Sequence, residues 1–320
     1  MTHIWVPRVK IIEPNDPVDM KTGMRGFYRM RAMRPDGRIR PLTDWFPNLI
    51  TNAGLNLIGS SASWLTACQV GSGTTPPSVS DTVLANRIAG TSNRISSQSS
   101  AIGTPPYYAT RTITYEFGQG AAAGNLTEVG VGNSTSGPTL FSRALILDGE
   151  GQPTTITVLP DEFLQVDYQL RIYPPLDDVQ GQVTISGNTY NYTLRAAQAG
   201  LASIWGLGQS GARAGGDFCD AYESDTLGPI TGLISGNSSS VFPSNSSYSP
   251  GTYYREFSAQ WGLSQGNFAT GIGGVSTYLG ESSFNAPMGR VQMVFSPKVP
   301  KNNTKIFTLI LRHTWAVRSL

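Results

Sequence analysis

Two stretches of this 320-residue chain carry similar short sequences in the same order, and the matched pairs lie 142 to 146 positions apart. The pairs are Ala53-Gly54-Leu55 with Ala199-Gly200-Leu201, Ser80-Asp81-Thr82 with Ser224-Asp225-Thr226, Tyr107-Tyr108 with Tyr253-Tyr254, and Gly124-Asn125 with Gly266-Asn267. Such a period is about the length of one ordinary domain, and it exceeds the roughly 20–50 residues of solenoid repeats. The order and spacing therefore predict an internal duplication, with chance similarity between two Gly/Ser-rich stretches as the alternative.

The composition indicates what the duplicated unit is made of. Charged residues are only 14% of the chain, below the roughly 25% of typical globular proteins. The 36 glycines and 21 prolines, with abundant Ser, Thr and Asn, disfavour helix interiors and favour short strands joined by turns. Aromatic residues at 10% can supply hydrophobic cores. We expect a mainly β protein with two similar β-sandwich domains, each with one short helix.

The repeat divides the chain into three segments. Residues 1–44 have no second copy and are expected to form an N-terminal basic arm or hairpin. Residues 45–178 are expected to be the first β-sandwich, which ends at Pro174-Pro175, and residues 179–320 the second, related one.

Local patterns predict where helices, strands and loops lie. Apolar residues at helical spacing predict a helix within 45–59, capped by Thr51 or Asn52, with a counterpart at 194–207. The Ser-rich stretches 91–106 and 236–251 are expected to be exposed loops. Strands are expected at 110–117, where Thr112, Thr114 and Glu116 share one face, and at 127–132, 140–147, 154–159, 163–173, 254–261, 289–295 and 305–317.

The N-terminal segment holds nine of the chain's 23 Lys and Arg residues. Pro35-Asp36-Gly37 predicts a hairpin turn, which would place arginines on one face. We expect this segment to contact a neighbouring subunit rather than nucleic acid, because acidic residues dilute its charge and the whole chain carries only +2. The candidate contact residues are Arg25, Arg29, Arg31, Arg34, Arg38 and Arg40.

The chain shows no apolar stretch of membrane-spanning length, and its first residues lack the apolar region of a signal peptide. Its two cysteines, Cys68 and Cys219, fall in comparable places of the two copies. We expect two buried thiols rather than a disulfide, in a protein made in a reducing cytoplasm.

Motifs for catalysis or metal binding are lacking in the sequence. The two histidines, His3 and His313, stand apart, and no zinc, calcium, phosphate-loop or nucleophile-elbow pattern occurs. Paired carboxylates at Asp161-Glu162 and Asp177-Asp178 could support glycan cleavage, but they are expected at loop or strand edges. We therefore expect no cofactor, no metal and no enzymatic activity.

Three short segments follow one another in a recognisable order. Asn48 to Leu55 fit the pattern Asn-x-Ile-Thr-Asn-x-Gly-Leu, Val70 to Gly73 read Val-Gly-Ser-Gly, and Asp81 to Leu84 fit Asp-Thr-x-Leu. In this order the segments resemble a group of tailed-bacteriophage virion proteins. The stretches 123–132 and 309–315 are also similar. The resemblance implies a tail fibre, tail tip or baseplate component, and it implies no catalytic residue.

We therefore expect a non-enzymatic structural protein of a phage tail, made in the host cytoplasm and located in the virion. Its partners would be other tail proteins and further copies of itself, with a trimer as the candidate oligomer. The alternatives are a receptor- or glycan-binding tail fibre module, or a capsid or collar decoration protein. For a host surface receptor, the candidate contacts are Tyr107, Tyr108, Tyr253 and Tyr254.

Overall fold

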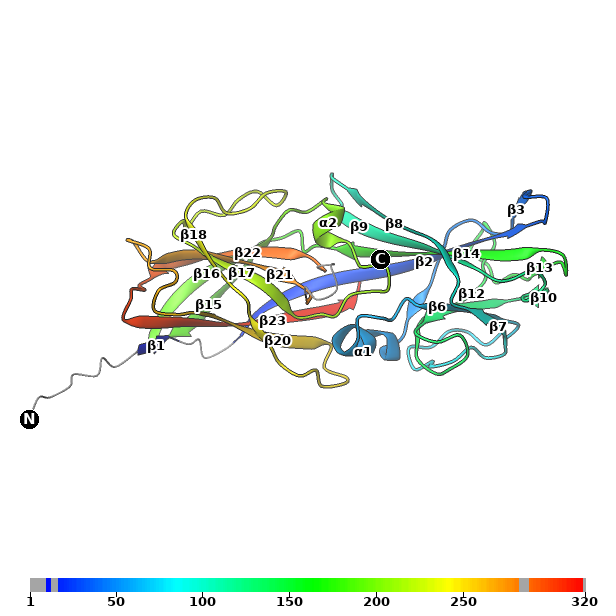
Figure 1. Cartoon of the computed structure of the whole chain (residues 1–320), viewed down its shortest axis with the longest axis horizontal. Coiled ribbons are helices and arrows are strands. Elements are labelled where there is room, and N and C mark those ends of the chain that lie inside the picture. Colours follow the sequence, from blue (N-terminus) through cyan, green and yellow to red (C-terminus); the bar gives the residue numbers. More distant parts are fainter. Residues whose placement is uncertain (1–9, 13–16, 282–287, 319–320) are drawn as a thin grey trace, which may run out of the picture.

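The computed structural model describes residues 10–12, 17–281 and 288–318, and regular structure in these ranges is almost entirely β. Figure 1 shows an elongated molecule with a group of strands at each end. The two short helices, α1 (Asn52–Ser60) and α2 (Ala202–Trp205), lie near its middle. The predicted mainly β fold with two short helices is confirmed.

A ten-stranded sheet runs through the whole molecule. Its main strand order is β19-β20-β23-β2-β14-β9-β8, with β1 beside β23 and with β3 and β4 beside β2. The strands are β1 (Lys10–Ile12), β2 (Val18–Met33), β3 (Ile39–Pro41), β4 (Phe46–Pro47), β8 (Arg94–Ile102), β9 (Tyr108–Glu116), β14 (Phe163–Tyr173), β19 (Ser244–Asn245), β20 (Tyr254–Trp261) and β23 (Lys305–Val317).

Two smaller sheets pack on this long sheet, one at each end, and a two-stranded pair completes the fold. The five-stranded sheet contains β5 (Leu49–Ile50), β12 (Leu140–Leu145), β11 (Glu128–Gly132), β6 (Ala67–Gly71) and β7 (Arg87–Thr91) in spatial order. The six-stranded sheet contains β15 (Val179–Ile185), β16 (Asn188–Ala196), β22 (Arg290–Val299), β21 (Ile272–Leu279), β17 (Gly216–Tyr222) and β18 (Ser238–Val241). The pair is β10 (Gly124–Leu126) with β13 (Ile156–Val158).

Each smaller sheet closes a separate hydrophobic core against the long sheet. The first core takes most of its residues from 24–172, and the second takes Val18, Met20 and residues between 183 and 311. We call these bodies the first lobe and the second lobe. They correspond to the predicted sandwiches, but the long sheet belongs to both, so a division at residue 178 stays a prediction.

Strand β2 belongs to both lobes. Residues Val18–Met24 pair in parallel with β23, and residues Gly23–Met33 pair in antiparallel with β14. The sequence predicts a basic arm or hairpin at 1–44. In the structure, most of the described part of this segment, 17–44, is instead a central strand of the long sheet (Figure 1, blue). The predicted hairpin turn does occur, since Met33 pairs with Ile39 and Gly37 has a positive φ of 84°.

The two lobes share one strand order. The five-stranded sheet contains the path β12-β11-β6-β7, and the six-stranded sheet contains β22-β21-β17-β18. In the long sheet, β2 is followed by β14-β9-β8 on one side and by β23-β20-β19 on the other. This correspondence supports the duplication, which itself stays a prediction.

Reciprocal tryptophan contacts join the lobes where the helices lie. The indole N–H of Trp315, on β23, donates to the backbone oxygen of Leu55 in α1 at 2.9 Å. The indole N–H of Trp64, which follows α1, donates to the backbone oxygen of Ala212 at 2.8 Å. Both bonds are buried, and Trp315 and Ala212 pack in the first core, so residues from the second half of the chain complete that core.

Three local predictions are wrong. The stretches 91–106 and 236–251 are not continuous loops, because they contain β8 in one case and β18 and β19 in the other. The second helix is much shorter than 194–207, because β16 continues to Ala196 and α2 begins only at Ala202. In each case backbone pairing with a neighbouring strand outweighs local propensity.

Helix α1 begins as predicted. Thr51 has an extended backbone, and its hydroxyl accepts a hydrogen bond from the backbone N–H of Gly54 at 2.9 Å. A Cβ added at Gly54 would lie 2.2 Å from the backbone oxygen of Phe141, on β12. The helix can therefore approach β12 only because this position is glycine.

We expect Gly54→Ala to destabilise the protein by about 1–3 kcal/mol, because the added methyl group overlaps a backbone atom that cannot rotate away. Helix propensity alone predicts the opposite effect, because replacing a helical glycine with alanine raises the free energy of unfolding by about 1 kcal/mol. Urea unfolding followed by tryptophan fluorescence measures the difference. Ser60→Ala, at the exposed end of the same helix, is the control, and a stabilised Gly54→Ala variant would contradict the prediction.

Candidate functional site

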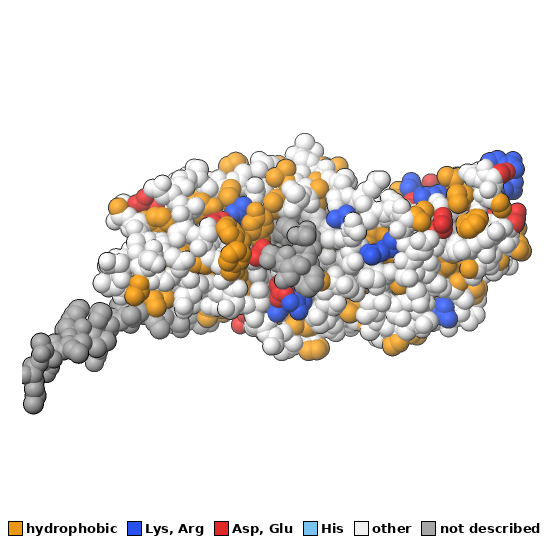
Figure 2. Space-filling view, in the orientation of Figure 1, with side chains coloured by type: hydrophobic (Ala, Val, Ile, Leu, Met, Phe, Trp, Pro, Cys, Tyr) orange, Lys and Arg blue, Asp and Glu red, His pale blue; other side chains and the backbone are white. Residues whose placement is uncertain are grey.

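The arginines predicted as subunit contacts lie on the outer face of the ten-stranded sheet and on the β2–β3 hairpin. Tyr28 and Met30 point into the first core, so alternate positions place Arg25, Arg29 and Arg31 on the opposite face of β2. Figure 2 shows Lys and Arg side chains gathered at the end of the molecule that carries β3. The hairpin arginines are Arg34, Arg38 and Arg40.

Asp167 on β14 binds two of these arginines. It pairs directly with Arg29 in the strand register, and its carboxylate lies 2.7 Å from Arg29 and 2.5 Å from Arg31. The Thr114 hydroxyl donates to its other oxygen at 2.7 Å. The carboxylate is buried while both arginines are partly exposed, so the arginines stabilise a charge that the sheet removes from water.

Glu162 binds the hairpin. Its buried carboxylate receives two hydrogen bonds from Arg40, at 2.6 and 3.1 Å, and one from the backbone N–H of Leu159. Arg34 lies farther away, at 3.9 Å. The hydrogen bonds from Arg40 hold the pKa of Glu162 below its ordinary value.

The remaining two arginines also have partners within the chain. Arg38 pairs with Asp36 across the exposed hairpin turn at 2.6 Å, and Arg25 lies over the ring of Phe27 at 5.5 Å. All six arginines therefore contribute to the protein's own structure. A contact with a neighbouring subunit stays a prediction for each of them.

Two of the four candidate tyrosines occupy matching positions in the two lobes. Tyr108 begins β9 and lies beneath Arg171 at 5.0 Å, and Tyr254 begins β20 and lies beneath Arg312 at 4.2 Å. Each arginine comes from the neighbouring strand, β14 or β23. These stacks cover part of each ring, and they recur on the two sides of β2 in the long sheet.

The other two tyrosines precede these strands. Tyr107 is half-buried. Tyr253 has a positive φ of 54°, packs against the first core, and accepts a hydrogen bond from the backbone N–H of Trp315 through its backbone oxygen. Contact between any of the four tyrosines and a receptor stays a prediction.

Three of the segments that carry the sequence resemblance, 70–73, 81–84 and 123–132, meet at the buried carboxylate of Glu128 and its partner Arg143. Glu128, at the start of β11, lies on the face of the five-stranded sheet that points away from the first core. It accepts hydrogen bonds from the backbone N–H groups of Gly73, Ala85 and Asn86 at 3.0, 3.0 and 2.7 Å. Glu128 thus holds both ends of the loop between β6 and β7.

Arg143 on β12 is the ion-pair partner of Glu128. Its guanidinium lies 2.8 Å from Glu128 and 2.6 Å from Asp81, and it donates to the backbone oxygen of Thr75 at 2.8 Å. A Cβ on Gly73 would lie 2.5 Å from the Glu128 carboxylate, so the loop requires glycine there. The sequence analysis did not single out Arg143, although an arginine within the apolar run 140–147 is the signal that could have found it.

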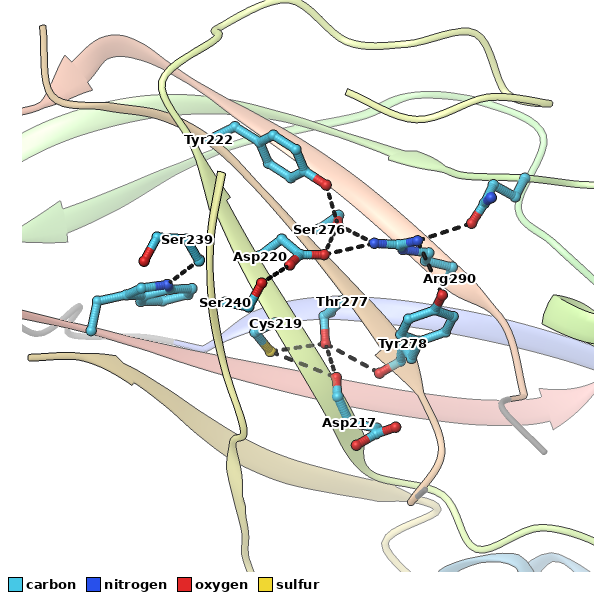
Figure 3. A network of polar contacts seen from close by, with 12 residues as sticks. Asp217, Cys219, Asp220, Tyr222, Ser239, Ser240, Ser276, Thr277, Tyr278 and Arg290 are labelled. Atoms are coloured by element: carbon cyan, nitrogen blue, oxygen red, sulfur yellow. Dashed lines mark hydrogen bonds and ion pairs between the residues drawn. The ribbon is translucent and has the colours of Figure 1, made fainter. Parts of the chain in front are cut away.

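The second lobe has a different buried network on its six-stranded sheet (Figure 3). Arg290 on β22 lies 2.7 Å from Asp220 on β17, and it donates to the hydroxyls of Ser276 and Tyr278 on β21 at 3.0 and 3.1 Å. The Gln198 side chain accepts a further bond at 3.1 Å. Both charged side chains are only 8% exposed. The network therefore joins the adjacent strands β22, β21 and β17, and the guanidinium of Arg290 neutralises the carboxylate of Asp220.

The thiols and the buried histidine are uncharged at neutral pH. Cys68 and Cys219 are free and buried, which confirms the predicted thiols, and burial raises the pKa of Cys219 to about 12. The Cys219 thiol bonds the Thr277 hydroxyl at 3.0 Å (Figure 3). Burial lowers the pKa of His313 to about 3, and its Nε2 lies 3.0 Å from the Thr22 hydroxyl.

One member of each carboxylate pair considered for glycan cleavage is bound by an arginine. Glu162 is held by Arg40, and Asp178 lies 2.6 Å from Arg195. Among the described residues, no group of three or more metal-ligating side chains could hold a metal ion. In the same part of the chain, neither helix has the length and apolar character needed to cross a membrane. His3 lies outside the described residues.

Comparison of the chain with protein-family models, curated proteins and solved structures finds no match.

We expect Asp220→Asn to destabilise the protein by about 3–5 kcal/mol, because Arg290 would remain buried without a carboxylate. The matched control is Asp178→Asn, because its partner Arg195 is about 29% exposed. Loss of this ion pair should cost under about 1 kcal/mol. Urea unfolding of both variants measures the two costs. Equal effects would show that burial of the Asp220–Arg290 pair has no energetic consequence.

We expect the stabilising effect of Glu162 to depend on pH. Its pKa is lowered in the folded protein, so its contribution is present above the unfolded pKa, about 4.3, and is lost as pH falls through the folded pKa. Glu162→Gln should lower the free energy of unfolding by about 2 kcal/mol at pH 7, with a shrinking difference below about pH 4. Unfolding curves from pH 7 to pH 3 test this, with Asp161→Asn, at the exposed neighbouring position, as the control. A difference that stays constant with pH would exclude titration of Glu162 as its source.

Proposed function

We propose that this protein is a non-enzymatic structural component of a phage tail, at the tail tip, at the baseplate or beside a fibre. It would assemble with other tail proteins and with further copies of itself, and it would be located in the virion. A trimer is the oligomer that we propose to test first.

The position of the phage-like residues is the observation that carries this proposal. Gly54 allows α1 to lie against β12, while Gly73, Asp81 and Glu128 meet around Arg143. These contacts hold a helix and a loop onto the five-stranded sheet. The shared motif therefore performs a structural task, which is what the resemblance to virion components implies.

The organisation of the two lobes supports the same role. Both lobes use β2, and the buried tryptophan bonds of Trp64 and Trp315 join them again where the helices lie. An elongated body of this kind resists bending between its lobes, because bending would break backbone hydrogen bonds of the shared strand. Resistance to bending suits a part that transmits force within a particle.

The test is to locate the chain in virions of the phage that encodes it. Purified particles are analysed by quantitative mass spectrometry, and a map of the intact tail then places the chain and counts its copies. We expect a fixed number of copies per particle that survives a high-salt wash. Absence of the chain from purified virions would overturn the proposal.

The alternatives give different results in the same preparation. A receptor-binding module would bind host cells as an isolated protein, and antibody against it would block adsorption. A capsid or collar decoration protein would appear on the head or neck in the map. Degradation of surface polysaccharide by the purified chain would contradict the non-enzymatic role.

A further inference from the structure

Arg111 is a charged residue on the core-facing side of β9. Its neighbours on that side, Ala109 and Ile113, are fully buried in the first core. The guanidinium donates from Nε to the backbone oxygen of Leu207 at 2.7 Å and from a terminal nitrogen to the Ser97 hydroxyl at 3.4 Å. Burial lowers the pKa of Arg111, and among the described residues no carboxylate counteracts this effect.

The arginines that this fold buries each have a carboxylate partner, whereas Arg111 is half-buried and has none among the described residues. These pairs are Arg143 with Glu128, Arg255 with Glu281, and Arg290 with Asp220. In the second lobe the position that matches Arg111 holds Phe257, because Arg111 pairs with Leu170 and Phe257 with Leu311 in the corresponding strands. Phe257 is buried in the second core. The lobe architecture therefore does not require a charge at this position.

The Arg111 side chain lines a cavity of about 500 Å³ at the junction of the lobes. Ser63 lines one part of it, and the turn Gly208–Gly211, which follows α2, lines another. The volume falls within the roughly 300–1,000 Å³ of small-molecule sites. Besides Arg111, the lining consists of two serines, Gln209, two glycines and one alanine, and this polar lining suits a ligand with many hydroxyl groups.

The far wall of the cavity is fixed in place. The backbone oxygen of Ser210 accepts hydrogen bonds from the backbone N–H groups of Trp64 and Leu65 at 2.9 and 2.8 Å. Arg94, on β8, donates to the backbone oxygen of Gln209 at 2.7 Å and to the Ser210 hydroxyl at 3.0 Å. The cavity is thus preformed, so little ordering cost opposes binding.

We propose that this cavity binds the carboxylate of an acidic sugar, which pairs with Arg111. A guanidinium has five N–H donors in a planar fork, and the bonds to Leu207 and Ser97 use three of them. The remaining two can bind a carboxylate. Among the residues that line the cavity, Arg111 is the charged one, while the Arg94 guanidinium behind the far wall already donates to Gln209 and Ser210. One available positive charge matches a monoanion better than a doubly charged phosphate, and the polar lining matches the sugar hydroxyls. This inference does not depend on a structural role in a tail.

The test measures binding of glucuronate to the full chain by isothermal titration calorimetry, with glucose as the neutral analogue of the same shape. We expect glucuronate to bind with a Kd of about millimolar or tighter and glucose to bind at least tenfold more weakly. Arg111→Gln should weaken glucuronate binding by about ten- to hundredfold, because a charge-assisted pair is lost. Arg111→Lys, which keeps the charge without the fork, should fall between the two proteins.

Arg171→Gln is the matched control, because Arg171 lies on the neighbouring strand β14 but on the opposite face of the same sheet. It should bind glucuronate as the wild type does. Thermal unfolding of each variant shows whether the chain is folded, and loss of binding counts only in folded protein. If Arg111→Gln is unfolded, the comparison of Arg111→Lys with Arg171→Gln decides the question.

Further ligands identify the source of the carboxylate. Binding of oligogalacturonate more tightly than free galacturonate would assign the cavity to a residue of an acidic polysaccharide, and the reverse order would assign it to a free sugar acid. Glucose 6-phosphate that binds more tightly than glucuronate would overturn the carboxylate assignment. Equal binding of glucuronate by wild type and Arg111→Gln, or binding by neither, would overturn the site.

Discussion

The backbone pairing of β2 is the constraint on which the rest of the structure depends. One continuous strand runs parallel to β23 over Val18–Met24 and antiparallel to β14 over Gly23–Met33. Each lobe therefore builds its core against a different part of the same strand. Loss of either pairing would expose half of the strand and open the core beneath it. The two lobes form one structural unit for this reason, although each has a core of its own.

The sequence predicts strands best where one face is buried and the other is solvated. Strands 163–173, 254–261 and 305–317 are predicted to the residue, because apolar and polar side chains alternate through them. Strand β8 cannot be found in this way, since its Ser-rich sequence RISSQSSAI has little apolar side to bury. It forms at the sheet edge because β9 offers it backbone partners. The role of β2 is equally hidden, since its partners lie far away in the sequence.

Only some of the matched sequence pairs occupy equivalent structural positions in the two lobes. Tyr108 with Arg171, and Tyr254 with Arg312, occupy the same strand positions in the two lobes and form the same stacks. Ser80-Asp81-Thr82 and Ser224-Asp225-Thr226 do not correspond, because the first stands late in the loop before β7 and the second stands just after β17. The supported part of the duplication is therefore the strand framework and its cation–π pairs, while the loops have separate contacts.

Buried ion pairs could not be predicted from the sequence, because strand register brings their members together. Asp81 and Arg143 meet only once β6, β11 and β12 are adjacent. Arg111 is different, because the alternation that places Thr112 and Thr114 on one face of 110–117 also places Arg111 on the other, beside Ile113. An arginine on the apolar side of a strand needs acceptors for its N–H donors. Leu207 and Ser97 accept three bonds from Arg111, and the described residues supply no carboxylate. The two remaining donors and the adjoining polar cavity are the basis of the proposed ligand.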